Sequence, residues 1–261
     1  MRLRVLFLVL AACCPFATAA AAATAVTSVA VGPTHACLLR SDGAVMCWGD
    51  NAYGQLGDGT TVSHDTAQRV AGLPLPATAI ALGRFHTCAL LNDKTMWCWG
   101  GNQGQLGLGD TTDRHIPVRI SALSGVIQIS AYERYTCAAT ATNTYCWGLN
   151  YEGRLGVGDT SNRTLPTPVS GVGGATSIAT GDDHACAVLG GAVKCWGYAA
   201  LGDGTGQSSN VPVQVAGITS GATSVATGDS HSCALVSGSV LCWGRNDSGQ
   251  LGIGNESAQD T

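Results

Sequence analysis

The sequence predicts an all-β protein, a β-propeller of four-stranded blades, and three observations support this prediction. A Cys-Trp-Gly triplet recurs five times in the 261 residues, and its tryptophan returns every 47 to 51 residues. Only 11% of the residues are charged and 36 are glycine, a composition typical of short strands joined by tight turns. Each repeat also contains several short apolar or β-branched runs, which is the pattern of strands.

Each repeat holds four strand candidates, as the second repeat illustrates. Residues 79–82 form one candidate, the segments around Cys88 and Cys98 form two more, and residues 117–120 form the last. Four antiparallel strands cannot bury both faces of their sheet alone, so neighbouring units must stack. A ring of blades is the arrangement that limits the exposed edges.

The cysteine of each triplet has a partner nine or ten residues upstream, and hairpin geometry accounts for this spacing. The eight residues between Cys186 and Cys195 divide into three opposed pairs around a Gly190-Gly191 turn. Between Cys37 and Cys47, the same three pairs leave a loop of three residues, 41–43, with glycine at the end. Opposed positions of an antiparallel pair are close enough for a disulfide. The predicted bridges are Cys37 to Cys47, Cys88 to Cys98, Cys137 to Cys146, Cys186 to Cys195 and Cys233 to Cys242.

The N-terminal residues have the pattern of an export signal. Arg2 and Arg4 precede an apolar run over 5–10, and Ala17-Thr18-Ala19 matches a cleavage site, so residues 1–19 are predicted to be a removed signal peptide. Two alternatives remain open, lipidation of Cys13 and a retained membrane-spanning leader. Membrane attachment is expected only in those two cases. The predicted location is secreted or cell-envelope, where disulfides form.

The recurring string reads His-x-Cys-Ala-Leu, then Gly-x-Val-x-Cys-Trp-Gly, then Asn-x-x-Gly-Gln-Leu-Gly, and residues 229–252 match it well. It resembles the repeat of the regulator of chromosome condensation family, and the cysteine pair in every repeat resembles exported bacterial members. The resemblance covers residues 26–261, with repeats at about 26–66, 67–116, 117–166, 167–210 and 211–261. It implies a propeller, usually seven-bladed, with a binding role. Because the fifth repeat stops before its last strand, we expect part of a six- or seven-bladed ring, or an incomplete five-bladed one.

Composition and motifs narrow the function. Acidic residues outnumber basic ones, 17 to 13, with no Lys/Arg run, so no nucleic-acid partner is expected. No phosphate loop, nucleophile elbow or paired carboxylates are present, so we expect no enzyme, cofactor or metal. The leading hypothesis is an exported interaction module that binds a protein or cell-surface partner through propeller-face loops. The alternatives are a guanine-nucleotide exchange regulator of a small GTPase, as in eukaryotic family members, and a structural segment of a larger surface protein.

Residues shared by all repeats build the blades, so the side chains that differ between repeats are predicted to bind the partner. The predicted binding residues are Tyr53, Trp97, Tyr132, Arg134, Tyr151, Arg154 and Tyr198. The five triplet tryptophans are expected to fill the space between blades. A histidine two residues before the first cysteine, replaced by Tyr135 in the third repeat, is expected to make a hydrogen bond within its own blade.

Overall fold

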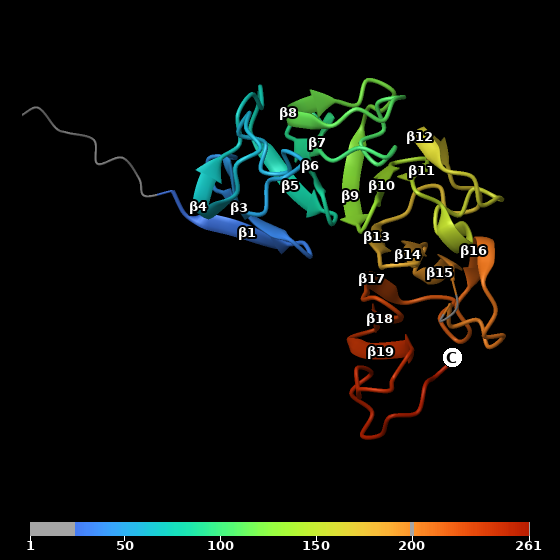
Figure 1. Ribbon diagram of the computed structural model, residues 1–261. Coiled ribbons are helices and arrows are strands. Elements are labelled where there is room, and N and C mark those ends of the chain that lie inside the picture. Colours follow the sequence, from blue (N-terminus) through green and yellow to red (C-terminus); the bar gives the residue numbers. More distant parts are fainter. Residues whose placement is uncertain (1–23, 199–200, 261) are drawn as a thin grey trace, which may run out of the picture.

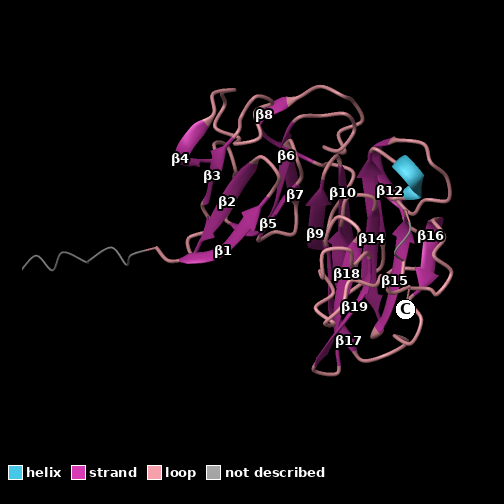
Figure 2. Cartoon of the chain, turned by 60° about the horizontal axis from the view of Figure 1, so that its bottom comes forward, coloured by secondary structure: helices cyan, strands magenta, loops and turns pink. Residues whose placement is uncertain are grey.

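The computed structural model describes residues 24–198 and 201–260. The predicted signal peptide at 1–19 and Cys13 lie outside the described residues. Figure 2 shows strands throughout the described chain, with one single-turn helix, η1 (Tyr151–Gly153). Over the described ranges, the structure contains no helix with the length and hydropathy needed to span a membrane.

Five antiparallel sheets follow one another along the chain, and within each sheet the strands pair in sequence order. Blade 1 contains β1 (Val26–Val31), β2 (His35–Arg40), β3 (Val45–Gly49) and β4 (His64–Arg69). Blade 2 contains β5 (Ala77–Leu82), β6 (His86–Leu91), β7 (Met96–Gly100) and β8 (Arg114–Arg119). Blade 3 contains β9 (Val126–Tyr132), β10 (Tyr135–Thr140), β11 (Thr144–Gly148) and β12 (Arg163–Pro168). Blade 4 contains β13 (Ser177–Thr180), β14 (His184–Leu189), β15 (Ala192–Gly197) and β16 (Ser209–Gln214). Blade 5 contains β17 (Ala222–Thr227), β18 (His231–Val236) and β19 (Ser239–Gly244).

The blades are arranged around an open arc, which confirms the propeller prediction (Figure 1). The first strands of consecutive blades, β1, β5, β9, β13 and β17, contact one another and form the inner side of the arc. Blades 1 and 5 are separated at the two ends (Figure 1). The fourth strand of blade 5 is represented by one bridge, between Gly244 and Gln259. Each inner blade therefore packs against two neighbours and each end blade against one.

The hairpins have the predicted register. Cys186 lies opposite Cys195, and the three pairs between them close on Gly190 and Gly191, both with positive φ. All five predicted disulfides are present in the structure. The turn at 92–94 contains no glycine, and Lys94 takes the left-handed conformation there with φ of 64°. Cysteine spacing alone was thus sufficient to set the pairing of these strands.

The hydrophobic core lies between the blades. Four of the five triplet tryptophans, Trp99, Trp147, Trp196 and Trp243, are fully buried, as expected for side chains that fill this space, whereas Trp48 of blade 1 is only partly buried. Each ring packs against the preceding blade, and the Nε1–H of Trp99 donates to the Gln55 carbonyl at 2.9 Å. Most of the apolar burial is therefore shared between neighbouring blades.

The histidines differ from the prediction, because their hydrogen bonds join blades instead of lying within one. The Nε2 atom of His35 lies 2.7 Å from Thr87 Oγ1 in blade 2. The same contact joins His86 to Thr136 at 2.8 Å and His184 to Ser232 at 2.7 Å. Because the Thr87 hydroxyl donates to the Gln55 carbonyl, it accepts from the histidine Nε2–H.

Tyr135 replaces the histidine in blade 3 and uses a different partner. Its hydroxyl donates to the carbonyls of Gly181 and His184, at 3.0 and 2.7 Å. Ala185 stands in blade 4 where blades 2, 3 and 5 have threonine or serine, and it lies in the same buried cluster as Tyr135. The larger ring is thus matched by a smaller residue in the next blade.

A glycine on each blade accommodates the tryptophan of the next, which gives a testable prediction. A Cβ at Gly57, where φ is 68°, would lie 2.5 Å from Trp99 Nε1. A Cβ at Gly252, which has the same φ, would have no described atom within 4 Å beyond its own chain neighbours. We expect Gly57→Ala to lower the free energy of unfolding by about 2–4 kcal/mol and Gly252→Ala by about 1 kcal/mol. Urea unfolding of the two variants measures the difference, and equal losses would mean that Trp99 moves aside without cost.

Candidate functional site

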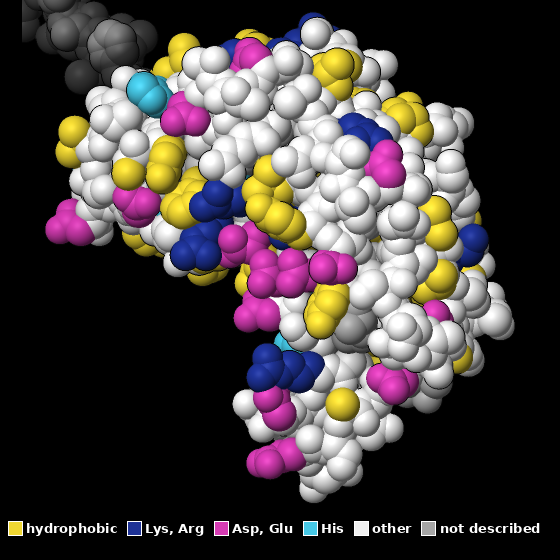
Figure 3. Space-filling view, turned by 45° about the vertical axis from the view of Figure 1, so that its right-hand side comes forward, with side chains coloured by type: hydrophobic (Ala, Val, Ile, Leu, Met, Phe, Trp, Pro, Cys, Tyr) yellow, Lys and Arg dark blue, Asp and Glu magenta, His cyan; other side chains and the backbone are white. Residues whose placement is uncertain are grey.

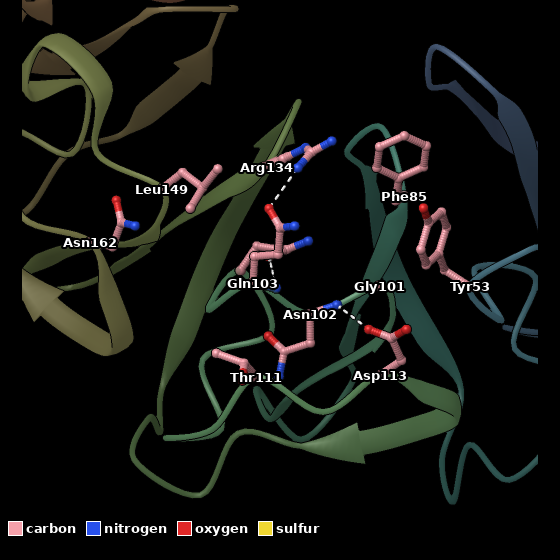
Figure 4. A pocket seen from close by; sticks show the side chains of 11 residues that line it. Tyr53, Phe85, Gly101, Asn102, Gln103, Thr111, Asp113, Arg134, Leu149 and Asn162 are labelled. Atoms are coloured by element: carbon pink, nitrogen blue, oxygen red, sulfur yellow. Dashed lines mark hydrogen bonds between the residues drawn. The ribbon is translucent and has the colours of Figure 1, made fainter.

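Side chains from three blades converge on one face of the arc (Figure 4). Tyr53 comes from the loop after β3 and Phe85 from the turn between β5 and β6. Gln103 comes from the loop after β7, and Arg134 from the turn between β9 and β10. The positions of these four side chains differ in sequence between repeats, whereas the strands that flank them recur in every blade.

An arginine–aromatic cluster, consisting of Tyr53, Arg84, Phe85 and Arg134, forms the centre of this face. The rings of Tyr53 and Phe85 lie 4.9 Å apart at a tilt of 53°. The guanidinium carbons of Arg84 and Arg134 lie 5.4 and 5.2 Å from the Phe85 centroid. Arg134 Nη1 donates to the Gln103 Oε1 atom at 2.6 Å. Phe85 is therefore in cation–π contact with two arginines, while the guanidinium of Arg134 retains further donors for a ligand.

The cluster borders a cavity of about 570 Å³. The Asp113 carboxylate accepts from the backbone N–H of Asn102 at 2.7 Å, which ties together the two ends of the loop between β7 and β8 that lines the cavity. The cavity is lined by Tyr53, Phe85, Gly101, Asn102, Gln103, Gln105, Thr111, Asp113, Arg134, Leu149 and Asn162. Two aromatic rings, one cationic group and several amide and hydroxyl groups thus surround a space large enough for a peptide side chain or a sugar unit.

Acidic residues lie next to the cluster, toward blade 5, and Figure 3 shows the basic and acidic side chains side by side along the concave edge. The pKa of Asp182 is raised by burial and by the nearby charges of Asp183 and Glu133. The Tyr132 hydroxyl donates to Asp229 Oδ1 at 2.6 Å, and burial together with this bond raises its pKa. Within 24–198 and 201–260, no group of acidic, histidine or cysteine side chains is arranged to hold a metal ion.

Arg154 has a supporting position instead of an exposed one. Its side chain is buried, and it donates to the carbonyls of Leu149 and Asp182, each at 2.9 Å. The guanidinium carbon lies 5.1 Å from the Tyr135 centroid and 5.3 Å from that of Tyr151. Arg154 therefore holds Tyr151, which is exposed, in place on the face.

The other predicted binding residues are distributed unevenly. Tyr53 and Arg134 line the cavity, Tyr132 borders the acidic region, and Tyr198 lines a smaller pocket with Asp183 and Asp229. Trp97 is half-buried against the core between blades 1 and 2, where its Nε1–H donates to Thr95. The structure thus places Trp97 apart from the cavity.

Sequence reasoning missed Arg84, Phe85 and Gln103. A signal for Phe85 was available in the turn before each histidine, which reads Gly-Pro-Thr-His, Gly-Asp-Asp-His and Gly-Asp-Ser-His in three repeats. In the second repeat the same turn reads Gly83-Arg-Phe-His86. Of these four turns, it alone has an aromatic residue beside an arginine. Comparison of the repeats position by position would have identified it.

The fold and this face define a disulfide-bonded propeller arc with a loop-lined cavity. Models of the regulator of chromosome condensation (RCC1) repeat match residues 42–90, 93–139, 143–188 and 191–235, and a second model of the same repeat matches 26–55, 77–105 and 222–250. These matches cover more than half of the chain. The chain therefore belongs to the regulator of chromosome condensation (RCC1) repeat family.

Among solved structures, human WBSCR16 superposes with a TM-score of 0.82 at 27% identity, over 91% of this chain and 66% of that one. Yeast RCC1 (Prp20), from its complex with Kap60, superposes with a TM-score of 0.80 at 22% identity, over 92% of this chain and 60% of that one, which establishes the fold alone.

Two curated relatives match part of the chain. The probable E3 ubiquitin-protein ligase HERC4 of Homo sapiens is 35% identical over 120 residues, and the ultraviolet-B receptor UVR8 of Arabidopsis thaliana is 33% identical over 129. These matches cover 44% and 47% of this chain, but only 11% and 29% of the relatives. The activities in their names belong to those much longer proteins.

Proposed function

We propose that this chain is an exported interaction module that binds a protein or cell-surface partner through the arginine–aromatic cluster and its cavity. The observation that supports this proposal is the convergence of Tyr53, Phe85 and Arg134, from three blades, on one cavity. None of these three side chains is required by the repeat. Arginine and aromatic residues are the side chains that contribute most to binding energy at protein interfaces.

The chemistry of the cluster favours a partner segment that carries a carboxylate beside an apolar side chain. Phe85 and Tyr53 offer aromatic surface, and Arg84 and Arg134 offer charged donors next to it. An arginine binds a carboxylate through two parallel hydrogen bonds, for which the amide oxygen of Gln103 is a weaker substitute. The partner's carboxylate would therefore displace Gln103 from Arg134.

The five disulfides favour an extracytoplasmic location, secreted or attached to the cell envelope, since cytosolic thiols are kept reduced. The alternative function, nucleotide exchange on a small GTPase, requires a cytosolic or nuclear chain. The disulfides therefore support the exported module over the exchange regulator. Whole-protein mass measured after export tests this location directly, because release after Ala19 removes a defined segment.

Binding through the cluster predicts the effect of a double substitution. Phe85→Ala combined with Arg134→Ala removes one aromatic and one charged contact, so the affinity for the partner should fall at least tenfold, roughly the loss of one strong interface residue. The partner is captured from the extracytoplasmic fraction of the producing cells, with the purified chain as bait, and its affinity is then measured by surface plasmon resonance.

Arg119→Ala is the matched control, because Arg119 is an exposed arginine on β8 that does not line the cavity. This variant should retain the full affinity. If instead the double variant binds as tightly as the parent, the partner uses another face. A small GTPase that is captured and exchanges nucleotide faster with the chain would support the exchange regulator in place of the exported module.

A further inference from the structure

Blade 1 contains a carboxylate site whose counterpart in blade 2 lines the cavity. The residue after the first Cys-Trp-Gly triplet is Asp50, and its Oδ2 atom accepts from Gln55 Nε2 at 2.8 Å. Its Oδ1 atom accepts from the Ala52 N–H at 3.2 Å and from the Ser63 hydroxyl at 3.4 Å. One carboxylate thus joins three donors of this loop.

Equivalent hydrogen bonds identify the residues that take these places in blade 2. In both blades, the backbone N–H two residues before the glutamine donates to the glutamine Oε1 atom. In both, the N–H of the asparagine that follows the site residue donates to a side chain near the end of the loop. The loop of blade 2 is one residue shorter, and Ala52 is the residue without a counterpart. The corresponding pairs, whose second members all line the cavity, are Asp50 with Gly101, Gln55 with Gln105 and Ser63 with Asp113.

Gln105 consequently has a donor without an acceptor. Its residue is 1% exposed, and the Gln103 N–H donates to its Oε1 atom at 2.5 Å, which directs Nε2 the other way. Within 24–198 and 201–260, no residue accepts from this Nε2 atom, whereas that of the equivalent Gln250 donates to Asp247 at 3.3 Å. An unpaired buried donor is unfavourable, so Gln105 favours a ligand that offers an acceptor.

The replacement of Ser63 by Asp113 changes what else the ligand must offer. The Ser63 hydroxyl donates to Asp50, whereas a carboxylate accepts hydrogen bonds and donates none. The N–H of Ala52, the other donor to the same oxygen, is missing from blade 2. A carboxylate placed over Gly101 would therefore face a like charge from Asp113 where blade 1 provides two donors.

We propose that the space over Gly101 is a carboxamide subsite, which takes an asparagine or glutamine side chain of the partner. A carboxamide has the shape of a carboxylate with one acceptor replaced by a donor, so its oxygen would accept from Gln105 Nε2 and its nitrogen would donate to Asp113. A trans secondary amide, as in a peptide backbone or an N-acetyl sugar, presents its C=O and N–H on opposite sides and cannot bridge both groups. The proposal rests on the proposed function, because it names a side chain of the same partner.

Substitutions at Gly101 test the subsite without a partner. The φ of Gly101 lies outside the left-handed region, and a Cβ there would lie 3.3 Å from the Cβ atoms of Tyr53 and Phe85, whichever side chain is introduced. Gly101→Asn places a carboxamide in the subsite and should melt several degrees above Gly101→Asp. In an Asp113→Ser background, which restores the donor of blade 1, the order should reverse. Arg134 acts on both backgrounds alike, so the same order in both would overturn the proposal.

Small probes test the ligand itself. Propionamide should shift the NMR resonance of the Gln105 side-chain amide in the parent and bind at least about tenfold more tightly than its isostere propionate. Gly101→Asn is the control, because its own carboxamide fills the subsite and should abolish the shift. Tighter binding of propionate would assign the subsite to a carboxylate and overturn the proposal. Binding of N-methylacetamide as tight as that of propionamide would overturn it in favour of a backbone or sugar amide.

The captured partner separates this proposal from the proposed function. Gly101→Asn leaves Phe85 and Arg134 in place and should lower the partner's affinity about tenfold, roughly the loss of one strong interface residue. The matched control Gly101→Ala adds the same Cβ without an amide and should lower the affinity less. If the partner binds Gly101→Asn as tightly as the parent but loses the double variant, the subsite is overturned and the function stands. If both variants bind like the parent, the function fails, and the probes alone decide the subsite.

Discussion

Loss of the five disulfides is expected to lower the free energy of unfolding by on the order of 10 kcal/mol, which equals the whole stability of a typical domain. Each bridge closes a hairpin of sequence separation 9 or 10, and a loop of this length contributes about 2–3 kcal/mol in the chain-entropy model. The reduced chain should therefore fail to show a cooperative thermal transition. Circular dichroism melts after refolding with and without a reductant measure this effect.

The loss of unfolding free energy should depend on which blade contains the disulfide that is removed. Removal of the central bridge, by Cys137→Ala with Cys146→Ala, leaves a gap in blade 3, where both cysteines are fully buried. Removal of the last bridge, by Cys233→Ala with Cys242→Ala, affects residues that are only partly buried. We expect the central pair of substitutions to be the more destabilising. A reduced chain that melts within a few degrees of the oxidised one would contradict the whole argument.

Acid is expected to destabilise the chain well before its carboxylates are protonated. Burial lowers the pKa of His35 and His184 to about 4 and that of His86 to about 3. In the unfolded chain these groups titrate near 6.5, so between pH 6.5 and 4 the unfolded state binds more protons than the folded state. The contribution of each buried histidine to the free energy of unfolding is fully present above pH 6.5 and decreases as the pH falls. At pH 5 the loss is about 2 kcal/mol per histidine.

Denaturant unfolding at pH 7 and pH 5 measures this loss, and His86→Gln assigns it. The variant keeps a side-chain donor near Thr136 but has no titrating group, so its stability should depend on pH about a third less than that of the parent. His115→Gln changes an exposed histidine and serves as the control. Equal stability of the parent at the two pH values would show that the histidines remain accessible to protons.

The sequence predicted the contacts between neighbouring strands of one blade, but it did not predict the contacts between neighbouring blades. Hairpin registers follow from counting, because the two cysteines and the turn are separated by at most ten residues. The bond from His35 to Thr87 joins residues 52 apart, and nothing in the local pattern indicates whether a polar partner lies in the same blade or the next. The prediction of a bond within the blade was therefore wrong, although the histidine was correctly identified as a structural residue.

In the candidate site, too, the sequence identified some of the residues, and only the packing of the blades showed their roles. Tyr53 and Arg134 were selected because they depart from the repeat, and they line the cavity. Phe85 departs from it equally and was overlooked, while Arg154 departs from it and proved to be buried. Departure from a repeat identifies side chains with an individual role, but only the packing of three blades shows whether that role is contact or support.

The single Tyr–Ala pair among junctions that otherwise pair histidine with threonine or serine has a consequence for how a tandem array reaches its native state. Five similar units offer many wrong neighbours during folding, since all have the same strands and nearly the same apolar faces. A unit docked out of order would place Tyr135 against Thr87 or Ser232, where the ring meets a larger side chain than Ala185, or would bury His35 against Ala185 with no acceptor. The tyrosine at the junction of blades 3 and 4 thus distinguishes this junction from the three that have a histidine, whereas the disulfides, all confined to single blades, favour no particular neighbour.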